Sequence, residues 1–231
     1  MLKLIRFFSR DENYDIGNTP VPMKKLIPEW YRKAESFWKS SDGMEGEGLK
    51  KCMPYMDTLV SGYAMLTQFD IFVKENPDGT LNISWNAPEQ LSGFIDERPA
   101  ELGATMPRPA GHHDNHLVWS GVWGFKTPRG YSALITHPLN RFDLPFTTTS
   151  GIIDSDEWYA PGNIPFFIKK GFTGVIPAGT PFAQVIPIKR KSWKMVTNDR
   201  GLQYADNYQG WLARQTETSY KKLMWHRKEF N

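Results

Sequence analysis

Short apolar segments separated by turns fill the second half of this sequence, and this pattern constrains the fold more than any other feature. Glycine and proline punctuate residues 117–188. The whole chain holds 19 glycines and 17 prolines among 231 residues, a share that exceeds the usual sum of about 12 per cent. Such punctuation favours short strands over long helices, so we predict a mainly β fold, an antiparallel jelly-roll-like barrel or sandwich. The predicted strands are residues 117–125, 130–137, 151–153, 164–168, 173–176 and 182–188.

A β-hairpin is predicted in the first half of the chain. Residues 63–73 form one apolar segment that suits a strand, and residues 81–85 form another. Residues 76–79 between them read Asn-Pro-Asp-Gly, which is a strong turn signal because these residue types favour turn conformations. The polar stretch of residues 88–115 is rich in proline and glycine, so we predict that it is mostly loop.

Arms are predicted on both sides of this β-rich region. Residues 2–8 indicate a first strand, and residues 20–37 indicate an arm with a helical turn that begins near Pro28. Residues 205–230 predict a C-terminal helix whose last turn carries several cations, as suits a helix C-terminus. Three apolar residues of the N-terminal arm recur at helical spacing, and we expect them to dock on the core: Trp30, Ala34 and Phe37.

Length and composition exclude several classes of protein. The length suits a single domain, divided into residues 1–49 (strand and arm), 50–195 (β core) and 196–231 (helical tail). A formal net charge of +3, from 28 basic and 25 acidic residues, is too balanced for a protein whose main task is to grip nucleic acid. The single cysteine, Cys52, excludes a disulfide framework, and no apolar run is long enough to span a membrane. We therefore expect no membrane partner.

Two segments resemble motifs of a known enzyme superfamily. Residues 151–156 read Gly-Ile-Ile-Asp-Ser-Asp, and residues 174–186 read Gly-Val-Ile-Pro-Ala-Gly-Thr-Pro-Phe-Ala-Gln-Val-Ile. This pair resembles two motifs of the trimeric dUTPase and dCTP deaminase superfamily. The resemblance implies a β-clip fold.

The same resemblance implies roles for individual residues. It makes Asp154 the general base that activates a water, with Trp158 or Tyr159 near the nucleobase and Gln184 serving phosphate binding or subunit packing. Asp156 is a further ligand-binding candidate, and Mg²⁺ would bridge the phosphates in such an enzyme. Asp154 and Asp156 point the same way if their segment is a strand, but the segment also suits a turn.

Other features of that superfamily are missing from this chain. Residues 137–145 replace its Pro-Arg-Ser-Gly phosphate loop, so the serine and the loop glycine are absent. Arg141 in this segment could still pair with a phosphate. The predicted C-terminal helix replaces the glycine-rich arm that closes over the nucleotide in the family.

A broader resemblance extends over residues 50–193. The order of motifs there resembles uncharacterised proteins of tailed phages, marine and cyanophage types in particular. The resemblance implies a viral origin, and it brings neither an activity nor a catalytic residue. The motifs that carry it are residues 127–132, 137–141, 144–146, 151–156 and 179–181.

A histidine cluster offers a possible metal site. His112, His113, Asp114 and His116 lie close together in the sequence, and imidazole and carboxylate are the usual ligands of zinc and non-haem iron. One arrangement uses His112 and Asp114 with a distal His137, and another places His113 and His116 on zinc. A solvated polar loop explains the same residues, so we expect no cofactor.

Two further features have structural explanations. Cys52 follows two lysines but has no histidine near it in the sequence, so we predict an inert, partly buried thiol. Residues 189–194 alternate cations with an aromatic residue, a pattern that can serve single-stranded nucleic acid. Because they directly follow a predicted strand, we interpret their lysines as protection of a sheet edge, and nucleic acid is not the expected partner.

Three functions remain open at this point. The one we expect is a non-catalytic phage protein that self-associates, as a trimer by analogy with the fold, and acts in the virion or in the host cytoplasm, with other phage particle proteins as further partners. The alternative is a dUTPase-like protein that binds nucleotides, or hydrolyses them as a pyrophosphatase does, through Asp154, Arg141 and Gln184. A metal-dependent oxygenase built on the histidine cluster is the third.

Overall fold

The computed structural model describes residues 3–9, 18–87, 93–99, 101–102, 104–105, 107–197 and 219–231. Most regular structure in these residues is antiparallel strand, which confirms the predicted mainly β fold. The helices are few and short: α1 (Glu29–Lys33), α2 (Met53–Val60) and α4 (Ser219–Leu223), with 3₁₀ turns at Met23–Leu26 and Leu49–Lys51. The strands are β1 (Arg6–Phe8), β2 (Val21–Pro22), β3 (Phe37–Lys39), β4 (Glu45–Glu47), β5 (Tyr63–Leu66), β6 (Ile71–Glu75), β7 (Leu81–Trp85), β8 (Ile95–Glu97), β9 (Leu117–Ser120), β10 (Gly124–Lys126), β11 (Tyr131–Thr136), β12 (Phe146–Thr148), β13 (Gly151–Ile153), β14 (Asn163–Ile168), β15 (Gly174–Ile176) and β16 (Pro181–Lys189).

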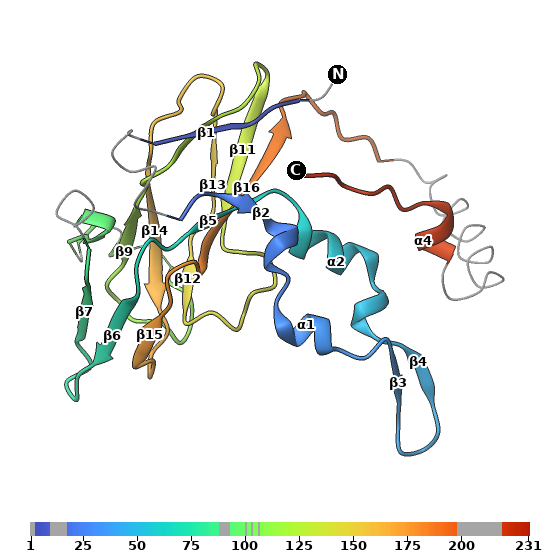
Figure 1. The fold of residues 1–231 in the computed structure, drawn as a ribbon, viewed down its shortest axis with the longest axis horizontal. Coiled ribbons are helices and arrows are strands. Elements are labelled where there is room, and N and C mark those ends of the chain that lie inside the picture. Colours follow the sequence, from blue (N-terminus) through green and yellow to red (C-terminus); the bar gives the residue numbers. More distant parts are fainter. Residues whose placement is uncertain are drawn as a thin grey trace.

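The strands form open sheets that pack as a sandwich. A five-stranded sheet has the order β13-β11-β16-β5-β2, and a four-stranded sheet has the order β12-β14-β9-β8. Three strands in the order β15-β6-β7 form a further sheet, while β1 pairs with β10 and β3 pairs with β4. Figure 1 shows the large sheets gathered on one side of the molecule, with α1, α2, α4 and the β3–β4 hairpin on the other.

The main core lies between the sheets and is rich in aromatic side chains. Trp119 of β9 is fully buried and stacks on Phe166 of β14, with the ring centroids 3.7 Å apart. Phe182 of β16 brings the five-stranded sheet into the same cluster, and its ring lies 5.0 Å from that of Trp119. Large rings bury much apolar area at a low entropic cost, so this cluster joins the two sheets of the sandwich.

The predicted hairpin is confirmed, because the alternation of its residues matches the two faces of a strand. In β6, Ile71 and Val73 are buried and Phe72 between them is exposed. Gly79 in the turn to β7 has φ +81°, a backbone conformation that glycine adopts without strain. The N–H of Asn76 donates to the carbonyl of Thr80 across this turn at 2.9 Å.

Two predicted strands are each divided between two sheets. Residues 63–73 give β5 and β6, because the chain bends at Thr67, whose hydroxyl donates to the carbonyl of Pro177 at 2.8 Å. The carboxylate of Asp70 accepts the N–H of Ala178 at 2.7 Å and holds the other side of the bend. Residues 117–125 give β9 and β10, which belong to different sheets. Both divisions depend on contacts between segments that lie far apart in the sequence, so the local sequence pattern did not indicate them.

The N-terminal arm differs in its details from the prediction. The helical turn after Pro28 is present as α1, but its buried residue is Tyr31. Trp30 and Phe37, which were expected to dock on the core, are exposed. The sequence patterns also did not indicate α2, or the β3–β4 hairpin in a segment of loop-like composition.

The C-terminal region contains a helix that is shorter than predicted. Part of the predicted helix, residues 205–218, lies outside the described residues. Within the described part, α4 ends at Leu223, and residues 225–231 carry no helix. Across the described residues, no helix has the length and apolar character needed to cross a membrane.

Candidate functional site

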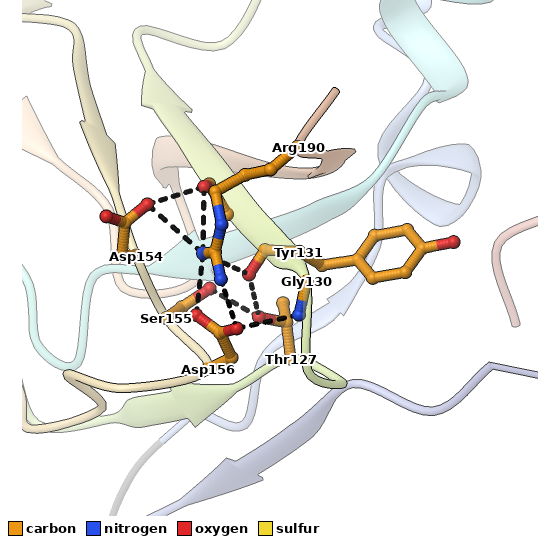
Figure 2. A network of polar contacts seen from close by, with 8 residues as sticks. Thr127, Gly130, Tyr131, Asp154, Ser155, Asp156 and Arg190 are labelled. Atoms are coloured by element: carbon orange, nitrogen blue, oxygen red, sulfur yellow. Dashed lines mark hydrogen bonds and ion pairs between the residues drawn. The ribbon is translucent and has the colours of Figure 1, made fainter. Parts of the chain in front are cut away.

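Arg190 lies at the centre of a polar cluster at the end of the five-stranded sheet (Figure 2). It directly follows β16, and its N–H donates to the carbonyl of Gly130 at 2.9 Å. Its guanidinium donates to both carboxylate oxygens of Asp156, at 2.7 Å from Nη1 and 2.5 Å from Nη2. Nη1 also donates to Asp154 Oδ1 at 3.2 Å. One arginine therefore neutralises two carboxylates that follow β13.

Asp156 is the buried member of this cluster, with a side chain that is only 2 % exposed. The hydrogen bond from Arg190 holds the pKa of the Asp156 carboxyl well below its usual range, and the N–H of Gly130, at 2.8 Å, adds to this effect against the opposing effect of burial. The carboxylate is thus ionised and fully engaged inside the protein. Its geometry is that of an ion pair that holds two chain segments together.

Asp154 is the exposed member, with 63 % of its side chain accessible to solvent. The hydroxyl of Ser132 donates to its Oδ1 at 2.6 Å. The segment after β13 is a turn, because the N–H of Trp158 donates to the carbonyl of Asp154 at 2.9 Å. Asp154 and Asp156 therefore differ in environment, one facing solvent and one buried, as the turn interpretation allowed.

A second contact fixes the same turn against the start of β11. The hydroxyls of Thr127 and Ser155 share a hydrogen bond of 2.7 Å, and both side chains are buried. The Thr127 hydroxyl also donates to the carbonyl of Tyr131 at 2.8 Å. The loop from β10 to β11 and the loop after β13 are therefore locked together beneath Arg190 (Figure 2).

The other two residues of the nucleotide-site prediction lie at the far end of the sheet. Gln184 is fully buried, its Oε1 accepts the N–H of Leu139 at 2.8 Å, and its Nε2 donates to two backbone carbonyls. Arg141 makes a bidentate pair with Asp143, at 2.8 Å from Nη2 to Oδ2. Both residues are thus occupied by partners within the chain.

The strand register gives the distance between Asp154 and Gln184 along the sheet. Asp154 bonds to Ser132 of β11, whereas Gln184 is paired with Thr136 of the same strand. Four residues at about 3.3 Å each place Asp154 and Gln184 about 13 Å apart along the sheet. Within a single chain, the structure does not bring Asp154, Arg141 and Gln184 together.

The two aromatic candidates after the turn are exposed. Tyr159 packs edge-on against Phe8, with ring centroids 5.8 Å apart, and the ammonium of Lys126 lies 4.5 Å from the centroid of its ring. Trp158 is mostly accessible to solvent. Tyr159 therefore helps to hold β1 against the sandwich, and Trp158 is available to a ligand or to another chain.

The histidine candidates take different partners. His113 is buried and lies with Nε2 3.1 Å from Oε2 of Glu75, at the wall of a cleft of about 840 Å³ that Asp114 also lines. Glu75 accepts the N–H of Gly171 as well, and this bond, with the one to His113, lowers the pKa of its carboxyl. Lys170 lies at the same wall.

The remaining histidines have their ring nitrogens or faces engaged elsewhere. His112 contacts the carbonyl of Ala110 with Nδ1 at 3.0 Å and the hydroxyl of Thr147 with Nε2 at 2.9 Å. His116 packs its ring near that of Phe167, with the centroids 6.1 Å apart. Among the described residues, no group of three or more histidine, cysteine, aspartate or glutamate side chains is arranged to hold a metal ion.

Sequence reasoning missed the residue that organises the site. Arg190 was included in the basic stretch of residues 189–194 and was not connected with the aspartates. No local signal could have found it, because Arg190 meets the aspartates only through the order of the sheet, in which both β13 and β16 flank β11. Cys52 lies between a 3₁₀ turn and α2 and is exposed, so the prediction that its thiol is partly buried is wrong.

Known proteins do not add an assignment to this geometry. No protein-family model matches the chain, and no curated protein sequence matches it either. The resemblances to tailed-phage proteins and to dUTPases therefore stay predictions.

Proposed function

We propose that this chain is a non-catalytic phage protein that self-associates through the β3–β4 hairpin and serves as a structural or accessory component of the particle. The observation that carries the proposal is the exposure of large apolar side chains on this hairpin. Phe37 is 55 % exposed and Met44 is 60 % exposed, and Trp38 on the opposite face is also exposed. Figure 1 shows the hairpin standing away from the sheets.

An exposed hairpin of this kind requires a covering surface to be stable. Its strands have three residues each, and within the described part of the chain no third strand pairs with them. A single two-stranded hairpin is marginally stable in water, and exposed aromatic side chains are typical of association surfaces. The indole ring of Trp38 lies close to Gly46 in β4, since a methyl group added at that glycine would lie only 3.0 Å from the ring. This contact gives Trp38 some support within the hairpin.

A second copy of this chain supplies a suitable covering surface. Strand β13 forms the edge of the five-stranded sheet, and Ile152 at its centre is exposed. Edge strands with exposed apolar residues pair readily with another chain. The hairpin and this edge are different surfaces, so the proposed contact is head-to-tail. In this proposal the contacts close into a ring. Three copies is the number that the dUTPase resemblance implies.

The polar cluster around Arg190 supports a structural role. Its buried ion pair fixes the point where the chain leaves β16 and continues as residues 190–197, which carry no regular structure. In one chain, Arg141 and Gln184 are far from Asp154 and bonded to other groups. This arrangement favours a non-catalytic protein over the nucleotide-hydrolysing alternative.

Light scattering coupled to gel filtration tests the proposal. We expect the wild-type chain to be a trimer and the double variant Phe37→Ser, Met44→Ser to be a monomer. The matched control is Phe72→Ser, which removes another exposed phenyl ring from a different sheet and should stay trimeric. A wild-type chain that is monomeric at every concentration would contradict self-association.

Two further measurements address the remaining parts of the proposal. The protein should copurify with phage particles, and its absence from both particles and assembly intermediates would count against the particle role. Hydrolysis of a deoxynucleoside triphosphate with Mg²⁺, lost in Asp154→Asn, would overturn the non-catalytic assignment.

A further inference from the structure

Four cations line one cavity beside the turn that connects β10 and β11. The cavity has a volume of about 420 Å³, and its walls come from β1, from the residues before it and from the turn. Lys3 and Arg6 contribute from the N-terminal segment, and Lys126 and Arg129 contribute from the other side. All four side chains are exposed, and among the residues that the structure describes no acidic one lines this cavity.

These cations are not neutralised by the part of the chain that the structure describes. None of the four makes an ion pair there, and the two aspartates of the neighbouring cluster are bonded to Arg190. The charge of the cavity is therefore a local excess, even though the net charge of the whole chain is only +3. Such a local excess of positive charge attracts anions and so raises their concentration near the surface.

The pairing of β1 with β10 places two of these cations side by side, which costs free energy. Arg6 lies directly opposite Lys126 in the antiparallel register. Like charges at directly opposed positions destabilise a strand pair. A bound anion between the two side chains would remove the repulsion, so the pair is an arrangement that a ligand stabilises.

Aromatic rings hold two of the cations in place without removing their charge. The ammonium of Lys3 lies 4.8 Å from the centroid of the Tyr131 ring, and that of Lys126 lies 4.5 Å from the centroid of the Tyr159 ring. These contacts restrict the lysine side chains before any ligand binds. Less side-chain entropy is then lost on binding, which raises the affinity.

The backbone at the rim is fixed as well. Gly130, next to Arg129, has φ +83° and donates its N–H to the buried carboxylate of Asp156. The N–H of Tyr131 donates to the carbonyl of Pro128 at 3.1 Å and closes the turn. The Arg190 cluster therefore supports one wall of the basic cavity.

We propose that this cavity binds phosphate groups, with Arg6 and Arg129 as bidentate donors and Lys3 and Lys126 as point charges. Arginine suits the planar, paired oxygens of a phosphate, and lysine adds charge without a fixed direction. Four cations around one cavity match a group of adjacent phosphates. The same chemistry is present in a free polyphosphate and in the backbone of a nucleic acid.

Binding of two probes distinguishes these sources. Inorganic triphosphate and a single-stranded oligothymidylate are titrated into the full chain by calorimetry at several salt concentrations. If free polyphosphate is the source, triphosphate binds and the oligonucleotide binds no more tightly. If a backbone is the source, the oligonucleotide binds more tightly and the logarithm of its affinity falls linearly with the logarithm of the salt concentration.

Charge-removing variants locate the binding in the cavity. Arg129→Gln and Arg6→Gln should each weaken binding by about tenfold, and should lower the salt slope for the oligonucleotide by about one. Arg6→Gln also relieves the repulsion with Lys126, so the thermal stability of the free protein should stay the same or rise. A loss of stability in this variant would indicate a structural role and would overturn the assignment of Arg6.

The control is Lys25→Gln, which removes the same charge from an exposed position outside the cavity. It should bind both probes as the wild type does. The proposal fails if neither probe binds, or if Lys25→Gln weakens binding as much as the cavity variants do. Failure of this proposal leaves the self-association test unaffected, because the hairpin residues are separate from the cavity.

Discussion

At the scale of single residues, His137 joins the loop after β11 to β12 through both of its ring nitrogens. The N–H of Thr148 donates to its Nδ1 at 3.3 Å, and its Nε2–H donates to the carbonyl of Arg141 at 3.0 Å. Both bonds together require the neutral imidazole, because a protonated Nδ1 has no lone pair to accept the Thr148 N–H.

This arrangement predicts that the protein loses stability on mild acidification. Burial lowers the pKa of His137 below its ordinary value of 6.5, and the charges of Lys169 and Arg141 act in the same direction, against the carbonyl of Arg141 and the carboxylate of Asp143. A lowered folded-state pKa means that the unfolded chain binds the proton more readily. The contribution of His137 is therefore complete above about pH 6.5 and is lost as the pH falls through the folded-state pKa. Urea unfolding between pH 7.5 and 5.5 measures this slope.

The matched variant for that experiment is His137→Gln. It removes the titrating group, so the free energy of unfolding should be lower at pH 7.5 and should change less with pH than in the wild type. An equal pH slope in the two proteins would contradict the assignment to His137.

The paired aspartates illustrate what a sequence indicates at this scale and what it leaves out. The motif identified Asp154 and Asp156 as candidate site residues. Their different environments depend on a turn, and the local sequence was compatible with either a strand or a turn. Their partner Arg190 is 34 residues further along the chain than Asp156. Only the shared pairing of β13 and β16 with β11 brings the three residues together, and this register is a property of the whole sheet.

At the scale of elements, the closest approach of two backbones explains one glycine. Gly62 lies between α2 and β5 with φ +72°, and a methyl group there would lie 2.2 Å from the carbonyl oxygen of Val185 in β16. Carbon and oxygen atoms that are not bonded to each other do not approach so closely. Both the conformation and the space therefore require glycine at this position.

We predict that Gly62→Ala is much more destabilising than Gly79→Ala. Both glycines have positive φ, but Gly79 in the hairpin turn has no atom within 4 Å of an added methyl group. Gly79→Ala should therefore reduce the free energy of unfolding by about 1 kcal/mol, the conformational cost alone. Gly62→Ala adds a backbone displacement and should cost several times as much, measured by urea unfolding. Similar values for the two variants would show that β5 can move away from β16.

Some elements could be predicted from a local pattern, and others depend on contacts between segments that lie far apart in the sequence. The β6–β7 hairpin has alternating burial and a turn sequence that sets its own geometry. The division of residues 63–73 depends instead on the bonds from Thr67 to residues 177–180, over a hundred positions away. The β3–β4 hairpin was missed because its glycine- and charge-rich segment has the composition of a loop.

At the scale of the whole molecule, the C-terminal segment returns to the first half of the chain. Oδ2 of Asp57 in α2 accepts hydrogen bonds from Trp225 Nε1 at 2.9 Å and from Lys228 Nζ at 2.6 Å. The ring of Phe230 packs edge-on against Tyr63, with centroids 5.9 Å apart. Figure 1 shows this segment running back from α4 toward α2. One carboxylate thus holds two groups of the segment.

This contact predicts that Asp57→Ala releases residues 225–231 from the body of the protein. The variant leaves the Trp225 and Lys228 donors without their acceptor, and trypsin should then cleave at Arg227 and Lys228 much faster than in the wild type. The matched control is Asp96→Ala, which removes an exposed carboxylate whose ion pair with Arg98 is worth little. Equal cleavage rates in Asp57→Ala and the wild type would contradict the role of Asp57.

The position of β16 in its sheet also has a kinetic consequence. β16 lies between β11 and β5, although residue 184 is 120 positions beyond its partner Ala64. Pairing over such distances requires long loops to close first, which slows folding into the millisecond-to-second range for β proteins. During synthesis, β5 and β11 emerge from the ribosome well before their common neighbour. The backbone edges that pair with β16 stay open until it arrives, so nascent chains of this protein pass through an aggregation-prone stage.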